Sequence, residues 1–198
     1  MAPVRRDQIV RATIRHLARD GYAQLTMKTL AREARVTQSI LHYYFRDKRA
    51  ILLAALDTVV ADLDRRVAAA QEQEGRDPRA RLRALVRACL EQAVGDREFW
   101  VVFVEFWGQV LHDRKLGQVN ADLYERTRRL IGRLVAEGAR AGVFRRVDSR
   151  QAAAVILGLV DGVSLQLTWD PGAFTLEGAA HFCEDALLRY LTPERRPP

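Results

Sequence analysis

The stretch TMKTLAREARVTQSILHYYFRDK, residues 26–48, decides the fold of this chain. It holds two short helical patterns separated by a break at residues 35–37. Thr26 and Thr37 each precede one pattern, where a hydroxyl oxygen can accept a hydrogen bond from a free N–H group of the first helical turn. A short polar helix held across another helix by a tight turn is a helix-turn-helix, whose second helix enters the major groove of DNA.

The second helix of this motif, residues 38–44, has a packing side and a polar side. On the packing side we expect Ile40, Leu41 and Tyr44. On the polar side, within reach of the base edges, we expect Gln38, Ser39 and His42. The amide of Gln38 suits adenine, with which a Gln side chain forms two hydrogen bonds.

The N-terminal quarter of the chain resembles the TetR family of transcriptional repressors. The positions that carry the resemblance lie within residues 5–55 and are Ile9, Ala12, Leu17, Gly21, Thr26, Leu30, Ala31, Ala34, Val36, Thr37, Leu41, Tyr43, Phe45 and Lys48. The resemblance implies a DNA-binding head and a body that dimerises and holds an inducer. It also implies that Thr37, Tyr43 and Lys48 contact DNA phosphates, and we expect the same of Thr26 and Lys28.

Two positions depart from the family pattern. Arg35 stands in the turn where the family usually has Gly, which adopts a positive φ at little cost. We therefore expect a turn that is either shaped differently or strained. The aromatic run is His42-Tyr43-Tyr44, where the family commonly has Tyr-Tyr-His. The operator sequence therefore cannot be transferred from a relative.

The charge of the chain is concentrated at its N-terminus. Residues 1–50 hold 11 Lys and Arg against 4 Asp and Glu, whereas residues 51–198 hold 21 of each kind. A basic region on a neutral body is typical of nucleic-acid binding. The alternative is a helical small-molecule-binding or interaction protein whose basic head binds another polyanion.

The periodicity along the chain predicts an all-α fold with nine helices and no strand. We divide it into a three-helix head, residues 1–47, and a larger helical body, residues 48–198. The expected helices cover residues 5–20, 27–34, 38–44, 48–74, 79–94, 98–112, 116–141, 149–168 and 175–191.

The helix expected at residues 149–168 is nearly free of charge and apolar on more than one side. Such a helix must be buried on two sides, either by a partner copy or inside the core of a monomer. We expect a homodimer, and with it a pseudo-palindromic operator. The expected interface residues are Ala154, Leu157, Gly158, Val160 and Asp161. This region also resembles BetI-like regulators, whose namesake is a choline-responsive repressor.

Five aromatic residues crowd residues 99–107, together with Glu105. Aromatic faces around a carboxylate can bind an organic cation, although the same stripe also fits an ordinary core. A neutral hydrophobic inducer is the alternative to a cation. The expected ligand-binding residues are Trp100, Phe103, Glu105, Trp107, Tyr124, Gln166 and Trp169.

No known catalytic or metal-binding motif is present, so we expect no enzyme activity, no metal and no cofactor. The N-terminus lacks the pattern of a signal peptide. The longest apolar run, residues 152–160, is too short to span a bilayer. The two cysteines, Cys89 and Cys183, are expected to be reduced. We therefore predict a cytoplasmic protein that does not engage a membrane.

Overall fold

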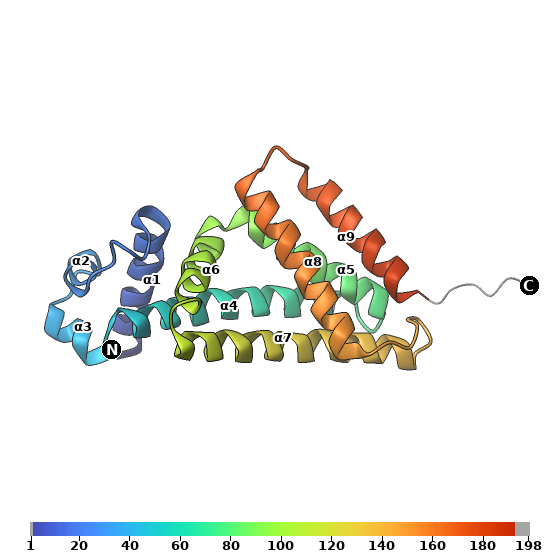
Figure 1. Cartoon of the computed structure of the whole chain (residues 1–198), viewed down its shortest axis with the longest axis horizontal. Coiled ribbons are helices and arrows are strands. Elements are labelled where there is room, and N and C mark those ends of the chain that lie inside the picture. Colours follow the sequence, from blue (N-terminus) through green and yellow to red (C-terminus); the bar gives the residue numbers. More distant parts are fainter. Residues whose placement is uncertain (1, 193–198) are drawn as a thin grey trace, which may run out of the picture. The chain divides into compact units, whose positions relative to one another are not determined.

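The computed structural model describes residues 2–192 and shows an all-α fold (Figure 1). Over these residues it has nine helices and no strand, so the predicted fold class is confirmed. The helices are α1 (Ala2–Asp20), α2 (Met27–Glu33), α3 (Gln38–Tyr44), α4 (Lys48–Gln73), α5 (Pro78–Gly95), α6 (Arg97–Val110), α7 (Arg114–Arg140), α8 (Ser149–Trp169) and α9 (Leu176–Leu191).

Side-chain caps fix where the helices of the DNA-binding motif begin. The Thr26 hydroxyl accepts a hydrogen bond from the N–H of Thr29 at 3.0 Å, and the Thr29 side chain accepts one in return from the Thr26 N–H. Thr37 accepts from the N–H of Ile40 at 3.2 Å. Each cap satisfies a backbone donor that the helix itself leaves unpaired. An isolated helix of seven residues is only marginally stable, so these caps contribute more to helix formation here than in the longer helices.

The chain forms two compact units. The first unit comprises residues 1–62 and 96–117, and the second comprises residues 63–95 and 118–198. Helices α1, α2, α3 and α6 lie wholly in the first unit, and α5, α8 and α9 lie wholly in the second. The two longest helices, α4 and α7, contribute residues to both.

In the first unit α1 packs against both α2 and α6, and α2 packs against α3. The centre of this packing is apolar, with Leu30 and Leu41 fully buried. The side chain of Gln8 adds a polar tie between helices, because its Nε2 donates to the carbonyl oxygen of Ala34 at 2.8 Å. This bond satisfies a carbonyl at the end of α2 that has no partner in the helix.

The turn after α1 is shaped by Gly21, whose φ is +77°. A side chain is disfavoured there by the backbone conformation alone. It is also excluded by space, since a Cβ at this position would lie 2.9 Å from Oε1 of Glu105 on α6. Glu105 therefore packs against the end of α1.

The core of the second unit is built around α5, which contacts both α8 and α9 (Figure 1). Fully buried side chains from these helices, such as Val86, Ile156 and Ala180, meet there. Although the run at residues 152–160 is short, α8 has 21 residues, and an 18-residue window within it has a mean hydropathy of 1.5, enough by length and composition to cross a membrane. Its inward side instead packs in this core.

Arg35 adopts a left-handed conformation with a φ of +52°, the one positive φ of a non-glycine residue among residues 2–192. The turn thus keeps the shape that glycine would favour and places an arginine in it. A left-handed backbone costs a residue with a side chain about 1–2 kcal/mol. The turn is therefore strained rather than reshaped, which resolves the two possibilities left by the sequence.

Replacing Arg35 with Gly should stabilise the protein by about 0.5–1 kcal/mol, because the relieved strain exceeds the entropy that glycine adds to the unfolded chain. Urea denaturation of the two proteins at equal concentration measures the difference. Arg35→Ala is the matched control, since it removes the same side chain but keeps the strained backbone. An equal gain in both variants would show that the arginine side chain, and not the φ angle, is responsible.

Candidate nucleic-acid interface and ligand site

Helix α3 presents an exposed polar side. Gln38, Ser39 and His42 are exposed, and within residues 2–192 their side chains make no hydrogen bond. Tyr43 is 81% exposed, and its ring stands edge-on to that of Tyr44 with the centroids 5.0 Å apart. Unpaired donors and acceptors on the exposed side of a helix are available to base edges and phosphates.

The expectation that Ile40 packs inward is wrong, because its side chain is 39% exposed. Leu41 alone of the three expected packing residues is fully buried, and Tyr44 is half-buried. An exposed Ile beside Gln38 and Ser39 can contact the methyl group of thymine. The sequence could not show this, because a seven-residue helix has too few turns to define its apolar face.

The residues expected at phosphates surround α3. Thr26, Lys28 and Thr37 are exposed, and Thr37 keeps its hydroxyl proton available because its oxygen acts as the acceptor in the cap. Lys48 is less free, since its Nζ lies 4.4 Å from the ring centroid of the buried Tyr22. This cation–π contact fixes where the Lys48 charge is presented.

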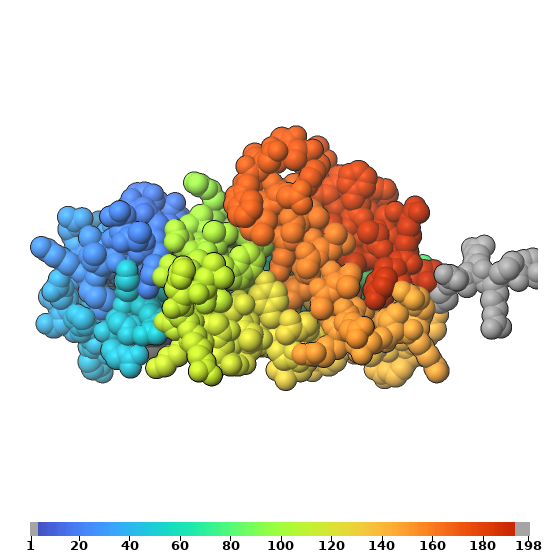
Figure 2. Space-filling view, in the orientation of Figure 1, coloured from blue at the N-terminus to red at the C-terminus, as the bar shows by residue number. Residues whose placement is uncertain are grey.

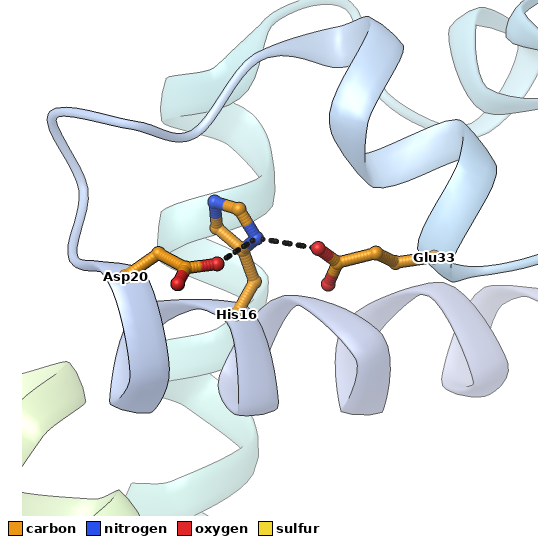
Figure 3. Close-up of side chains that lie close together, drawn as sticks. All are labelled: His16, Asp20 and Glu33. Atoms are coloured by element: carbon orange, nitrogen blue, oxygen red, sulfur yellow. Dashed lines mark hydrogen bonds and ion pairs between the residues drawn. The ribbon is translucent and has the colours of Figure 1, made fainter.

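An ion-pair cluster ties α2 to α1 (Figure 3). Nδ1 of the buried His16 lies 2.9 Å from Oε1 of Glu33 and 3.3 Å from Oδ2 of Asp20. Arg19 donates to both carboxylates. Because Glu33 is on α2 and the other three residues are on α1, the cluster sets the orientation of the helix on which α3 is mounted.

A guanidinium group contacts both carboxylates of this cluster. Hydrogen bonds from Arg19 lower the pKa of Asp20, and for Glu33 the hydrogen bonds from His16 and Arg19 outweigh the effect of burial and lower its pKa as well. His16, Asp20 and Glu33 have the donor atoms of a metal site. However, the Arg19 guanidinium already donates hydrogen bonds to both carboxylates, so the cluster is explained as a structural contact.

The aromatic residues of α6 pack with one another in the first unit. The rings of Phe103 and Trp107 are 4.9 Å apart, and those of Trp100 and Trp107 are 6.4 Å apart. Trp100 and Phe103 are buried, whereas Trp107 is half-buried. The indole Nε1 of Trp100 is buried and has no acceptor within the described residues, an unusual condition for a buried N–H group.

Two polar residues meet in the second unit. The Tyr124 hydroxyl on α7 donates to Oδ2 of Asp161 on α8 at 2.9 Å. Burial raises the pKa of Asp161 to about 6, even though the Tyr124 hydrogen bond acts in the opposite direction. Burial and the adjacent Asp161 carboxylate raise the pKa of Tyr124 as well. The structure gives Asp161 no Lys or Arg partner within residues 2–192.

The seven expected ligand residues thus fall into separate groups. Trp100, Phe103, Glu105 and Trp107 belong to the first unit, and Tyr124, Gln166 and Trp169 belong to the second. Gln166 and Trp169 are exposed near the end of α8, and Nε2 of Gln166 donates to the carbonyl of Gly162. Of the three in the second unit, Tyr124 contacts another candidate residue, Asp161, which we had expected at a dimer interface.

The outward side of α8 is apolar and exposed. Among the expected interface residues, Ala154 and Gly158 are exposed, Leu157 is half-buried, and Val160 is only 4% exposed. Val155 of α8 and Phe182 of α9 are 51% and 66% exposed but were missed. Figure 2 shows the surfaces of α8 and α9 next to each other, in accord with the packing of these two helices.

Comparison with known proteins gives consistent matches over nearly the whole chain. Residues 9–55 match the family model of bacterial regulatory proteins of the tetR family, and residues 78–192 match that of the BetI-type transcriptional repressor, C-terminal. The HTH-type transcriptional regulator BetI of Burkholderia ambifaria is 33% identical over 190 residues, 93% of each chain. That of Burkholderia thailandensis is 32% identical over 98% of this chain and 96% of its own.

Two solved structures with the same fold are similar as well. A transcriptional regulator of Saccharomonospora viridis, in complex with choline, has a TM-score of 0.82 and 27% identity, and the match covers 98% of this chain and all of the other. A protein of Pseudomonas aeruginosa PAO1, described as a transcriptional regulator, has a TM-score of 0.85 and 24% identity, with coverage of 96% and 92%. The second shows the fold alone.

Replacing Asp161 with Asn should stabilise the protein at pH 7.5 by about 2 kcal/mol. The raised pKa, about 6 against an ordinary 3.8, means that the charged carboxylate is disfavoured in the folded state. Protonation stabilises the folded protein fully below about pH 4, and this contribution is lost as the pH rises through about 6. The advantage of the variant should therefore shrink by about 1 kcal/mol at pH 5.

Urea denaturation of both proteins at the two pH values measures this difference. Asp122→Asn is the control, since Asp122 is an exposed carboxylate of the same unit. It should change stability little at either pH. If Asp161→Asn destabilises the protein at pH 7.5, the carboxylate is compensated and our account of its surroundings is incorrect.

Proposed function

We propose, for a chain that belongs to the TetR family of bacterial transcriptional regulators, that it represses transcription as a homodimer and leaves its operator when a small organic cation binds in the body. The observation that carries the DNA-binding part is the exposed, unpaired polar side of α3. Such a protein works in the cytoplasm, and we propose no catalytic role for it.

Gln38, Ser39 and His42 are assigned to base edges, and Ile40 is assigned to a thymine methyl group. Phosphates are assigned to the exposed or partly exposed residues around them, namely Thr26, Lys28, Thr37, Tyr43 and Lys48. Base contacts carry sequence information, whereas phosphate contacts position the protein on any duplex. The two groups should therefore respond differently to mutation.

Gln38→Ala should relax the preference at one base pair of each half-site, because it removes a base contact and no charge. Lys28→Ala should instead weaken binding to all sequences alike and reduce the salt slope by about one unit. Lys48→Ala should act in the same way. Gel-shift titrations on DNA from upstream of its own gene and on random DNA, at several salt concentrations, separate these effects.

If both kinds of variant lost affinity equally for operator DNA and for random DNA, the division into base contacts and phosphate contacts would be contradicted. Absence of any preference for upstream DNA by the unaltered protein would favour the other candidate function, a basic head that binds another polyanion.

The dimer is assigned to the outward sides of α8 and α9. Val155, Trp169 and Phe182 are large apolar side chains left exposed there, and Ala154 and Gly158 between them permit close approach of another helix. Exposed apolar faces of this kind are typical of protein interfaces. A two-fold dimer would set two copies of α3 on successive major grooves, about 34–36 Å apart or a multiple of this.

Val155→Arg and Phe182→Arg should each convert the dimer to monomer, because a buried unpaired charge at an interface costs several kcal/mol. Light scattering at micromolar concentration measures the mass. Leu111→Arg is the control, since Leu111 is 81% exposed on the first unit. Val160 is unsuitable for this test because a charge there would disrupt the core. A dimer that persists in both interface variants would place the interface elsewhere.

The proposal of an organic cation rests on the similar regulator that was solved with choline and on the aromatic residues of α6. The inducer must bind better to a conformation in which the heads fit the operator poorly. We assign the coupling to α4, which contributes residues to both units. Its first turn is tied to the start of α7 by the ion pair between Arg49 and Asp113, 2.5 Å apart.

Trp107→Ala should weaken the binding of the inducer. It should leave DNA binding in the absence of inducer unchanged, because Trp107 is half-buried and distant in sequence from α3. The measurement is the choline concentration that releases the protein from its operator. Glu105→Gln tests the charge of the ligand: a cation that faces Glu105 loses affinity, and a neutral compound does not. If Trp107→Ala unfolds the protein, which circular dichroism would reveal, the aromatic residues serve the core alone.

A further inference from the structure

Polar side chains of α7 and α8 meet inside the second unit, and further polar residues lie one helical turn from them. Asp161 accepts the hydrogen bond from Tyr124, as described above. Asn120 lies one helical turn before Tyr124 on α7, and Ser164 lies one turn after Asp161 on α8, so each shares the side of its helix with a member of the pair. Burial and, to a smaller extent, the carboxylates of Asp161 and Asp64 raise the pKa of the Cys89 thiol on α5.

Two acceptors in this group have no partner. Oγ of Ser164 and Oδ1 of Asn120 are buried and make no hydrogen bond within the described residues, and Ser164 is fully buried. Buried polar atoms of native proteins are nearly always hydrogen-bonded, so each exception calls for an explanation. Two such atoms lie one helical turn from Tyr124 and Asp161, a pair that contains a largely buried carboxylate. They indicate a site that can accept hydrogen bonds from a ligand.

Within residues 2–192, the negative charge of Asp161 also lacks a partner of opposite sign. Two arginines follow Tyr124 on the next turn of α7, and both are paired with other carboxylates. Arg126 pairs with Asp64 at 2.8 Å, and Arg128 pairs with Glu125 at 3.1 Å. A largely buried carboxylate without a cation is costly to keep. The site therefore offers one negative charge and two free acceptors, and no free positive charge.

We propose that Asn120, Tyr124, Asp161 and Ser164 bind an organic ammonium ion that carries N–H donors, in preference to a quaternary ammonium ion. This deepens the proposed function, on which it rests, by naming the chemical class of the inducer and by assigning its ammonium group to residues of the second unit. The α6 residues of the first unit are tested separately by Trp107→Ala and Glu105→Gln. A quaternary ion would balance the charge of Asp161 but leave Asn120 Oδ1 and Ser164 Oγ unpaired. A site with buried acceptors rejects a ligand that lacks the matching donors. Recognition of a quaternary ion instead calls for several aromatic faces, and this group holds one, Tyr124.

The N-methylation series from ethanolamine through N-methylethanolamine and N,N-dimethylethanolamine to choline tests this directly. Each member keeps one positive charge and one hydroxyl group, while the number of N–H donors falls from three to none. Isothermal titration with the full-length protein at pH 7.5 should show affinity falling along the series, with ethanolamine at least tenfold tighter than choline.

Variants of the group separate charge from hydrogen bonding. Asp161→Asn should weaken the binding of all four compounds by tenfold or more, because it removes the negative charge that attracts the positive charge they have in common. Ser164→Ala should weaken the binding of ethanolamine several-fold and leave the binding of choline nearly unchanged, since it removes a hydrogen-bond acceptor and no charge. Asp122→Asn, an exposed carboxylate outside the group, should leave all four affinities as they are.

Equal or tighter binding of choline, or no binding by any of the three amines, overturns the inference. So does an ethanolamine preference that survives both Asp161→Asn and Ser164→Ala. A parallel gel-shift keeps the two proposals apart: release from the operator by choline but not by the amines would leave the ligand-responsive repressor standing and remove this assignment. No sequence-specific DNA binding at all would defeat the proposed function, whereas the titration series would still decide the ligand class.

Discussion

The position of α3 depends on the ion pairs that hold α2 against α1. His16 and Arg19 reach Glu33 across the two helices, and the buried ring of His16 leaves little freedom for the contact to shift. Since α2 and α3 are joined by only four residues, 34–37, fixing α2 on α1 restricts α3 as well. Arg35 then has to adopt its left-handed conformation for the chain to enter α3 at Thr37. The strained residue thus lies in the connection between the helix that the ion pairs hold and the helix that carries the exposed polar side.

Local signals in the sequence were sufficient to predict the fold and the family. Threonine caps at Thr26 and Thr37 mark helix starts because a hydroxyl oxygen pairs with N–H groups only three residues away. Apolar periodicity gives the other helices for the same reason, as both depend on neighbours in sequence. The family resemblance read from residues 5–55 is confirmed by the match over residues 9–55.

Features that depend on long-range packing could not be predicted in this way. Nothing local shows that Glu105 lies against Gly21, or that Asp161 accepts a hydrogen bond from Tyr124, 37 residues away. The outward side of α8 was misjudged for a related reason. A helix apolar nearly all round gives no indication of which side the core takes, so Val160 was expected at the surface and Val155 was overlooked.

Asp161 offers a physical reason for a ligand to act on this protein at all. Without a cation, the buried carboxylate raises the free energy of the second unit, and a bound ammonium ion would remove that cost. A ligand shifts a conformational equilibrium only by the difference in its affinity for the two states. A conformation that opens the Asp161 group to a cation gains this neutralisation, whereas one that keeps it closed does not. The same buried charge that weakens the free protein can therefore supply the 1–3 kcal/mol typical of coupling between two binding sites.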